Sequence, residues 1–518
     1  MGKRVIVVGA GIAGLAAAVY AQKSGFDVSV YESHTIPGGN CSAWRRGGYL
    51  FEAGMHWLTG SKNGTAVNKL WRETGAINDE SEILLGDPFL TCYSPAGKES
   101  LDKASFFRNV DTFESELLKI TAAREAADST DCSSANSSYY SSDRKLIKKM
   151  CRDIRKYKAM SMPVLDIPFV KVKKRDRTFL KAAPKMLGAL LTAPYYGSFS
   201  VTEYAEKFKN PAITHLLKKA INEEYSAVAL FFTLGGYMSG DCGYVKGGSL
   251  KMTQNMADYF EKIGGKIFYS SRVEKIIVEN KNATHIVQNG KTTEADYVIV
   301  TQDTLAALPQ LFDFTFSDRW TKRLFAATRD NLISCTYICI GVETDLSDED
   351  ESLSFTLEKP LEFAGKTITT LHLNNYARYE GHAPKGATAL TVLLGADAYD
   401  YWKTCKENGT YAEAKEKLYH DVLTRIEAFL PQIRGKAAVH DVATQLTFER
   451  YCGTYRGSWM TRSLPGSTFG SFPCKTKDIQ NVYFAGQRIQ PPGGLPVAIA
   501  TARKAVQVLC RDTGSVFG

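Results

Sequence analysis

The stretch "KRVIVVGAGIAGLAAAVYAQKSGFDVSVYES", residues 3–33, decides the fold. Its first apolar run predicts a buried strand, the alanine-rich run before Gly25 predicts a helix, and a second apolar run predicts a strand ending at Glu32. Between the first strand and the helix, residues 9–14 read G-A-G-I-A-G and match G-x-G-x-x-G. This order predicts a βαβ unit of the kind that binds dinucleotides.

Each glycine of this motif has a physical role in such a unit. Gly9 permits the tight turn, Gly11 lets the backbone approach a pyrophosphate, and Gly14 lets the helix pack on the strand. The helix start offers free N–H groups and the positive end of the helix dipole. Glu32 lies eighteen residues beyond Gly14, where a carboxylate can accept hydrogen bonds from a ribose.

Two further glycine loops indicate a ligand that is longer than one nucleotide site. The first is the pair Gly38-Gly39, shortly after the second strand, and the other is Gly493-Gly494-Leu495-Pro496 near the end of the chain. A single extended ligand that touches all three loops explains their presence. This pattern favours FAD over NAD.

Composition indicates the number of domains, the state of the cysteines and the compartment of the protein. The chain has 518 residues, of which 44% are hydrophobic and 23% charged, so we expect two globular domains. Its eleven cysteines contain no Cys-x-x-Cys, and no two histidines have metal-ligand spacing, so we expect neither disulfides nor a metal site. No signal peptide is evident before the first strand. These features predict a cytoplasmic protein.

The net charge of +9 comes from one segment. Between Arg144 and Lys185 there are fifteen Lys or Arg and three Asp, a local balance of +12, so the rest of the chain sums to −3. Cations alternate with Leu, Phe, Met and Tyr over residues 144–196, which predicts a helical segment. Two interpretations stay open: a solvated cationic face, or a peripheral attachment to an anionic membrane surface. No nucleic-acid recognition motif accompanies the segment, so we expect no nucleic-acid partner.

The rest of the chain reads as a mixed second domain. Residues 247–299 predict a helix followed by strands, and residues 330–450 predict long strands with one long helix. The Ser-rich residues 126–143 predict a mobile loop. We therefore expect an α/β protein with a Rossmann-like FAD-binding domain (1–65, 240–305 and 478–518) and a mixed α+β substrate domain (66–239 and 306–477).

The whole chain resembles the phytoene desaturase-like flavoproteins, which include carotenoid desaturases, carotenoid isomerases and retinol saturase, within the amine-oxidase-type FAD superfamily. The resemblance rests on "VIVVGAGIAGLAAA", "GGYLFEAGMHWLTG", "GYVKGGSLKMTQNMADYFEKIGG" and "NVYFAGQRIQPPGGLPVAIATARKA". It implies that Gly9, Gly11, Ala13 and Gly14 hold the FAD pyrophosphate and Glu32 the ribose. It further implies an adenine contact from the backbone of Val273 and flavin contacts from Gly486, Gly494, Leu495 and Pro496.

One position departs from the family pattern. Where relatives often have Arg after the glycine pair, here Asn40 follows Gly39. An amide can hydrogen-bond a phosphate but cannot neutralise it, so we expect either that Arg45 or Arg46 compensates or that cofactor affinity is lower.

Two residues are candidates for the chemistry itself. Gly54-Met55-His56 resembles the retinol saturase pattern more than that of the carotenoid desaturases, which favours saturation, with His56 as a proton donor or as a wall of the pocket. Lys246, beside a glycine pair, is either a flavin-facing cation or an ordinary surface lysine. Tyr451, Tyr455, Arg456 and Trp459 are candidates for a substrate tunnel or for the core.

The resemblance implies an FAD-dependent oxidoreductase acting on CH–CH groups. It would saturate or desaturate C–C bonds of a lipophilic polyene or isoprenoid-like substrate by hydride transfer at flavin N5. No second G-x-G-x-x-G is evident, so we expect an external electron donor or acceptor. A flavin amine oxidase and a redox-inactive lipid carrier of the same fold are the alternatives.

Overall fold

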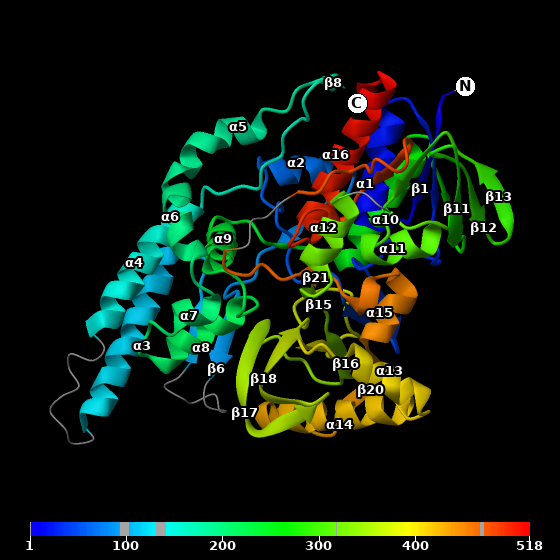
Figure 1. Cartoon of the computed structure of the whole chain (residues 1–518). Helices are drawn as coiled ribbons and strands as arrows, with labels where there is room; N and C mark the ends of the chain where they lie inside the picture. The colour runs from blue at the N-terminus through cyan, green and yellow to red at the C-terminus, as the bar shows by residue number, and fades with distance from the viewer. Residues whose placement is uncertain (1, 94–102, 131–140, 317–318, 467–470) are drawn as a thin grey trace.

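The computed structural model describes the whole chain except residues 1, 94–102, 131–140, 317–318 and 467–470. It has three regions (Figure 1). A parallel sheet with α1 and α16 lies at the upper right, a group of helices from α3 to α9 lies at the left, and a second sheet with α13 and α14 lies at the bottom.

A five-stranded parallel sheet forms the first region, and it confirms the predicted α/β fold. Its strand order is β10-β2-β1-β14-β22, with every neighbouring pair parallel. The strands are β1 (Arg4–Val8), β2 (Asp27–Tyr31), β10 (Lys266–Phe268), β14 (Tyr297–Val300) and β22 (Val482–Phe484). They come from all three segments predicted for the FAD-binding domain; the domain boundaries themselves stay a prediction.

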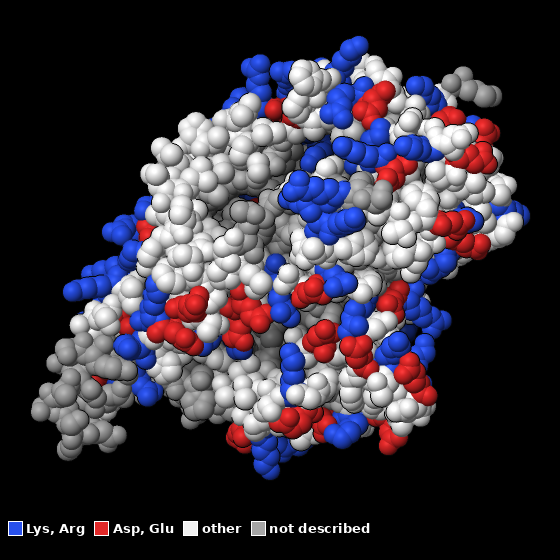
Figure 2. Space-filling model, in the orientation of Figure 1, with Lys and Arg blue, Asp and Glu red and all other residues white. Residues whose placement is uncertain are grey.

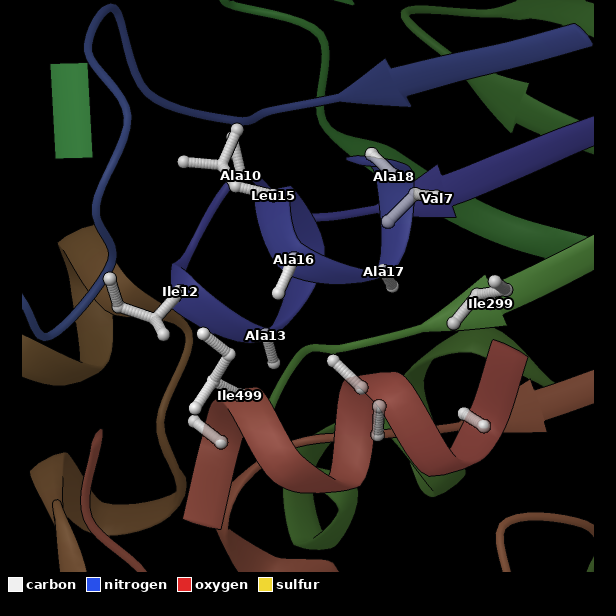
Figure 3. Close-up of a cluster of buried hydrophobic side chains, with 14 of the residues drawn as sticks. Val7, Ala10, Ile12, Ala13, Leu15, Ala16, Ala17, Ala18, Ile299 and Ile499 are labelled. Carbon is white, nitrogen blue, oxygen red and sulfur yellow. The ribbon is translucent and has the colours of Figure 1, made fainter. Parts of the chain in front are cut away.

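Helix α1 (Ile12–Lys23) is buried on nearly all sides. Its alanines allow a close approach between β1 and the long C-terminal helix α16 (Leu495–Thr513), so that two ends of the chain pack together (Figure 3). Ala16, Ala17 and Ala18 are all fully buried. A larger side chain at any of them would have no space at this packing density.

Further elements complete this region. Helix α10 (Gly248–Lys262) packs beside α1, and a three-stranded antiparallel sheet follows β10. Its strands are β11 (Val273–Glu279), β12 (Asn282–Gln288) and β13 (Lys291–Glu294). The short hairpin of β3 (Ala43–Arg46) and β4 (Tyr49–Glu52) and the helix α2 (Ala66–Glu73) connect this region to the rest.

A seven-stranded mixed sheet forms the lower region. Its strand order is β20-β16-β19-β18-β17-β6-β7. The strands are β6 (Leu90–Tyr93), β7 (Lys103–Phe106), β16 (Thr336–Val342), β17 (Ser352–Phe363), β18 (Lys366–Asn375), β19 (Thr388–Leu394) and β20 (Ala437–Ala443). Helices α13 (Tyr399–Glu407), α14 (Tyr411–Phe429) and α15 (Gln445–Cys452) accompany it, as the strand-and-helix pattern of 330–450 predicts.

The helical region has its own hydrophobic core. Its members are α3 (Val110–Thr130), α4 (Ser141–Tyr157), α5 (Thr178–Ala182), η1 (Ala183–Met186), α6 (Leu187–Gly197), α7 (Val201–Ala205), α8 (Pro211–Ala220) and α9 (Ala227–Met238). The loop predicted at 126–143 is wrong at both ends, because α3 continues to Thr130 and α4 begins at Ser141. The two helices enter the predicted loop from either side, over residues 126–130 and 141–143. Residues 131–140 lie outside the described residues.

The remaining elements are short. They are β5 (Ile83–Leu84) with β9 (Tyr244–Val245), β8 (Lys171–Val172) with β23 (Val516–Phe517), β15 (Leu332–Ile333) with β21 (Met460–Thr461), α11 (Thr304–Leu311), α12 (Arg319–Thr328), η2 (Pro431–Ile433), η3 (Tyr455–Gly457) and η4 (Gln487–Ile489). Among the described residues, no helix combines the length and the apolar character needed to cross a bilayer.

Candidate cofactor and substrate site

A cavity of about 1420 Å³ runs between the three regions. It exceeds the roughly 300–1,000 Å³ typical of a pocket for one small ligand. The predicted cofactor residues line one end of it: Gly9, Gly11, Ala13, Glu32, Gly39, Asn40, Val273, Gly486, Gly494, Leu495 and Pro496. His56 lines the same cavity, so the fold brings together residues from both ends of the chain.

The turn between β1 and α1 is built around glycines for steric reasons. Gly9 has φ +98°, in the region that glycine adopts without strain. Gly14 is not a lining residue: a Cβ there would overlap the carbonyl oxygen of Gly9. Gly11, in contrast, has ordinary backbone angles, and its nearest neighbour across the turn would lie 3.7 Å from an added Cβ. Glycine is therefore required at position 14 because the turn leaves no room for a side chain. At position 11 its absence of a side chain leaves space in the cavity instead.

Two helix N-termini face this end of the cavity. Helix α1 begins after Gly11 and helix α16 after Gly494, and neither has a side-chain cap for its first N–H groups. Free N–H groups at a helix start, together with the helix dipole, attract anionic groups. The backbone thus offers two places for phosphate or another electron-rich group.

Glu32 is buried at the end of β2 and is already anchored. Its Oε2 accepts a hydrogen bond from the Ala10 N–H at 2.7 Å, and its Oε1 accepts from the His34 N–H at 2.7 Å. The carboxylate oxygens keep further lone pairs for a ribose hydroxyl. Glu32 therefore holds the glycine turn against the loop that follows β2 while it lines the cavity.

The expected compensation for Asn40 by a neighbouring arginine is wrong. Arg46 forms an ion pair with Asp441, Nε to Oδ2 at 3.1 Å, and Arg45 donates to the Gly381 carbonyl oxygen. Neither lines the cavity, because the β3–β4 hairpin carries both toward the second sheet. The Oδ1 of Asn40 is buried with no hydrogen-bond partner among the described residues. Because this oxygen is an acceptor, a hydroxyl or N–H of a bound cofactor would be its partner, and a phosphate oxygen would not.

Sequence reasoning missed a buried ion pair at this site. Arg488 and Asp303 both line the cavity, each side chain is 1% exposed, and Arg488 Nη2 lies 3.0 Å from Asp303 Oδ2. Asp303 also accepts from the Tyr455 N–H, and Arg488 donates to the Met460 carbonyl oxygen. The pair ties α11, η4 and β21 together. The only sequence signal was an arginine inside the third glycine loop, "FAGQRIQPPGG".

His56 lies on a loop that a buried carboxylate holds in place. Glu52 Oε1 accepts from the N–H groups of Gly54 and Met55 at 3.1 and 3.3 Å. Its Oε2 accepts from the Tyr244 hydroxyl and the Ser249 N–H, both at 2.9 Å. The fully buried Glu52 thus links the His56 loop to the start of α10.

The environment of His56 keeps its ring neutral. Burial, with a smaller contribution from His372, lowers the pKa of His56 to about 4. The ring is stacked nearly parallel to Tyr337, with centroids 6.4 Å apart. Its Nδ1 has no hydrogen-bond partner among the described residues. At neutral pH such a ring can accept a proton but holds none to give as an imidazolium.

Lys246 does not belong to the site. Its Nζ lies 3.0 Å from Glu82 Oε2 and 3.0 Å from Glu380 Oε2 at the surface, and it does not line the cavity. These ion pairs raise its pKa. The prediction that placed it near a flavin is wrong because Lys246 follows the end of β9 and its ammonium group is held at the surface by Glu82 and Glu380. Of the aromatic and basic cluster, Trp459 and Tyr451 line the cavity, whereas Arg456 pairs with Asp400.

The other end of the cavity is lined mainly by apolar side chains, with Lys158, Ser161, Thr178, Asn222 and Thr233 among them, and we call it the apolar arm. Its residues come from the loop after α4, from η1 and α6, from the turn after α8 and from α9: Met160, Met186, Leu190, Ile221, Val228 and Phe232. No acidic residue lines the cavity from these segments. Among the described residues there is no cluster of His, Cys, Asp or Glu that could hold a metal ion.

These residues fit FAD. The glycine turn and the two uncapped helix starts suit the phosphates of an extended cofactor, and the unpartnered Asn40 Oδ1 suits a hydroxyl or N–H of the same cofactor. A βαβ unit with a glycine turn beside a cavity is the arrangement found in dinucleotide-binding folds.

Residues 12–510 match the family model for flavin containing amine oxidoreductases, and the chain belongs to that family.

Two curated relatives are similar along nearly the full length. The 1-hydroxycarotenoid 3,4-desaturase of Flavobacterium sp. (strain P99-3) is 24% identical, covering 97% of this chain and 98% of the relative. The phytoene desaturase (lycopene-forming) of Paracoccus sp. is 22% identical, covering 99% and 98%. Among solved structures, an oxidoreductase from Methanosarcina mazei has a TM-score of 0.58 at 17% identity, covering 97% and 100%. The chain is thus an oxidoreductase-family protein with a flavoprotein fold.

Proposed function

We propose that the protein is an FAD-dependent oxidoreductase that acts on CH–CH groups of a lipophilic polyene or isoprenoid-like substrate. The observation that carries the proposal is the continuity of one cavity. Its glycine-rich end suits FAD, and the same space continues into the apolar arm. The names of the two curated relatives, both desaturases of carotenoid-type substrates, support this substrate class.

The apolar arm supplies orientation and excludes water. Methionine, leucine and phenylalanine side chains offer a long hydrocarbon no hydrogen bonds, so burial of apolar surface drives its binding. A protonated amine would need a free anion beside it, and the carboxylate that lines the cavity just after α9, Asp241, already accepts from the N–H groups of Gly60 and Lys62. This argues for a hydrocarbon substrate over an amine.

The direction that we propose is desaturation. A bound flavin would supply the acceptor for a hydride from one carbon of the substrate. The neighbouring carbon must lose a proton for the double bond to form, and we propose His56 as its acceptor because it lines the cavity and its Nδ1 has no partner among the described residues. The Gly-Met-His pattern favoured saturation with His56 as proton donor, but a pKa of about 4 leaves almost no imidazolium at pH 7. Electrons would leave through an external acceptor such as a quinone or a separate protein.

The test uses flavin colour. Purified protein loaded with FAD is incubated without oxygen with saturated isoprenoid analogues, and absorbance of the oxidised flavin is followed. We expect bleaching by these substrates and a product with one more double bond per flavin reduced. Reoxidation of photoreduced protein by polyenes, without bleaching in the forward experiment, would reverse the proposed direction.

Two controls separate the alternatives. Hydrogen peroxide formed from a panel of amines would favour an amine oxidase. A protein that stays colourless and binds no FAD under any loading condition would contradict the oxidoreductase proposal and favour a lipid carrier.

A further inference from the structure

Residues 178–197 (α5, η1 and α6) form a continuous helical strap along the outside of the apolar arm. Leu180, Leu187, Leu191 and Tyr195 are 55%, 59%, 74% and 43% exposed and do not line the cavity. Their spacing of seven, four and four residues places them on one side of a helix. The strap therefore presents an apolar stripe to the outside of the molecule.

The inner side of the strap is apolar as well. Met186, Ala189 and Tyr196 are buried, and Phe179, Met186 and Leu190 line the cavity. Helix α6 contains no charged residue. A helix that is apolar on all sides is typical of the interior of a protein or of contact with lipid. In this structure only one of its sides is covered.

Cations gather at the N-terminal end of the strap. Lys174, Arg175, Arg177, Lys181 and Lys185 are exposed, and none forms an ion pair with a described carboxylate. The acid of this stretch, Asp176, is 8% exposed and bonds to Lys69 instead, Nζ to Oδ2 at 3.2 Å. The charge of these five side chains is therefore not neutralised within the described part of the molecule.

The first half of the basic segment behaves differently. On α4, Arg155 pairs with Asp111 and Glu114, and Lys156 pairs with Asp153. The other side of α4 is buried in the helical core, with Ile147, Met150 and Ile154 fully covered. On α4 most cations are thus paired and only Lys145 and Lys148 are exposed without an ion pair to a described carboxylate, whereas all five cations at the start of the strap are unpaired.

We propose that the strap docks on an anionic lipid bilayer, with its leucines in the acyl region and its cations at the headgroups. Figure 2 shows an uncharged surface over α5 and α6 that borders a hollow of the molecule, with Lys and Arg toward β8. Charge complementarity selects this occupant, because unpaired cations beside exposed leucines match acidic headgroups above acyl chains. Phe169, just before β8 in the chain, is a further exposed apolar side chain, with 94% of its surface exposed.

The strap has the membrane on one side and the cavity on the other. Leu190 and Phe179 line the cavity while Leu187 and Leu191 face outward. A lipophilic substrate could pass from the acyl layer to the apolar arm without crossing water. This role as an entry surface rests on the proposed function, whereas docking itself does not.

Vesicle co-sedimentation of the FAD-loaded protein tests the docking. Vesicles of phosphatidylcholine alone are compared with vesicles containing phosphatidylserine. We expect binding to the anionic vesicles that falls with salt. Lys174→Gln/Lys181→Gln/Lys185→Gln should weaken it on the order of 100-fold, since each cation near a charged surface contributes roughly fivefold. Leu187→Ser/Leu191→Ser should weaken it more than about tenfold.

Matched variants elsewhere on the surface control for total charge and apolar exposure. Lys359→Gln/Lys366→Gln/Lys385→Gln removes three exposed cations of the second sheet, and Leu85→Ser removes a leucine that is 48% exposed. Both should bind as the unaltered protein does. Equal losses in strap and control variants, or no binding by the unaltered protein, would overturn the proposal. A concentration-dependent dimer that the leucine variant loses would assign the surface to a second copy of the chain.

Turnover separates this proposal from the proposed function. The strap variants should keep turnover of substrate in detergent micelles and lose it for substrate embedded in anionic vesicles. Vesicle binding without any turnover would contradict the proposed function and leave the docking in place. Equal turnover of vesicle-embedded substrate by strap and control variants would overturn the role of the strap in entry.

Discussion

The two ends of the cavity are built by different parts of the polypeptide. At the cofactor end, main-chain groups and glycines of three loops face the ligand space, and their positions follow from backbone sterics. At the apolar arm, side chains of several helices and a loop between residues 158 and 232 supply the walls. A backbone site depends on a few irreplaceable glycines, whereas a side-chain site tolerates changes of similar volume. Their responses to mutation should therefore differ.

The largest effect is expected at Gly14. Gly14→Ala places a Cβ on the carbonyl oxygen of Gly9 and near Thr301, so the turn must shift. We expect the free energy of unfolding to fall by at least about 3 kcal/mol and FAD to be lost. Gly11→Ala is the control, because its Cβ has space in the protein. Gly11→Ala should keep the unfolding midpoint in urea and still bind less FAD. Identical behaviour of the two variants would contradict the assignment of Gly14 to packing and Gly11 to cofactor binding.

A smaller effect, confined to catalysis, is expected at His56. His56→Ala should keep the absorbance of bound FAD and lower kcat roughly 10²- to 10⁴-fold, the range for loss of a positioned proton acceptor. Rapid-mixing measurement of flavin reduction checks this directly. A normal rate of flavin reduction would make His56 only a wall of the pocket.

The pH dependence follows from the same group. With a pKa of about 4 for His56, proton acceptance is available above pH 4 and is lost as the pH falls through that value. We expect the acidic limb of kcat near pH 4, not near 6.5. The unfolded chain takes up this proton below pH 6.5, so stability should fall between pH 6.5 and 4, by at most about 3 kcal/mol. Urea unfolding of His56→Ala at both pH values should show a smaller loss.

A moderate effect is expected at the carboxylate that positions the His56 loop. In Glu52→Gln the side-chain amide can accept from fewer of the four donors that surround Glu52. We expect a loss of about 2–4 kcal/mol in unfolding free energy and a fall in kcat with little change in KM. Tyr244→Phe removes one of these donors together with the hydrogen bond between the Tyr244 hydroxyl and His382 Nε2, and should cost about 1–3 kcal/mol. Equal kcat in Glu52→Gln and the unaltered protein would rule out the positioning role.

The smallest effect is expected at Lys246. Its charge is solvated and paired at the surface with Glu82 and Glu380. Lys246→Gln should leave flavin content and kcat within about twofold, since exposed ion pairs contribute little. A tenfold loss of kcat would contradict this and indicate that Lys246 acts at the cofactor.

The cofactor half could be predicted because its signals are local. The strand, the glycine turn, α1 and Glu32 occupy one short stretch, and backbone sterics allow few structures for it. The prediction for Lys246 was wrong because neighbouring glycines do not determine the direction in which a lysine side chain points. The buried pair of Arg488 and Asp303 was missed for a related reason, since its partners are separated by 185 residues.

The sequence by itself thus determined the nucleotide fold, the glycine positions and the excess of cations. Only the tertiary structure decided which cations remain unpaired, which leucines face outward, and that His56 is neutral. Those properties depend on contacts between distant segments. Burial and pairing of a side chain are set by what packs against it, and periodicity along the chain contains no information about that neighbour.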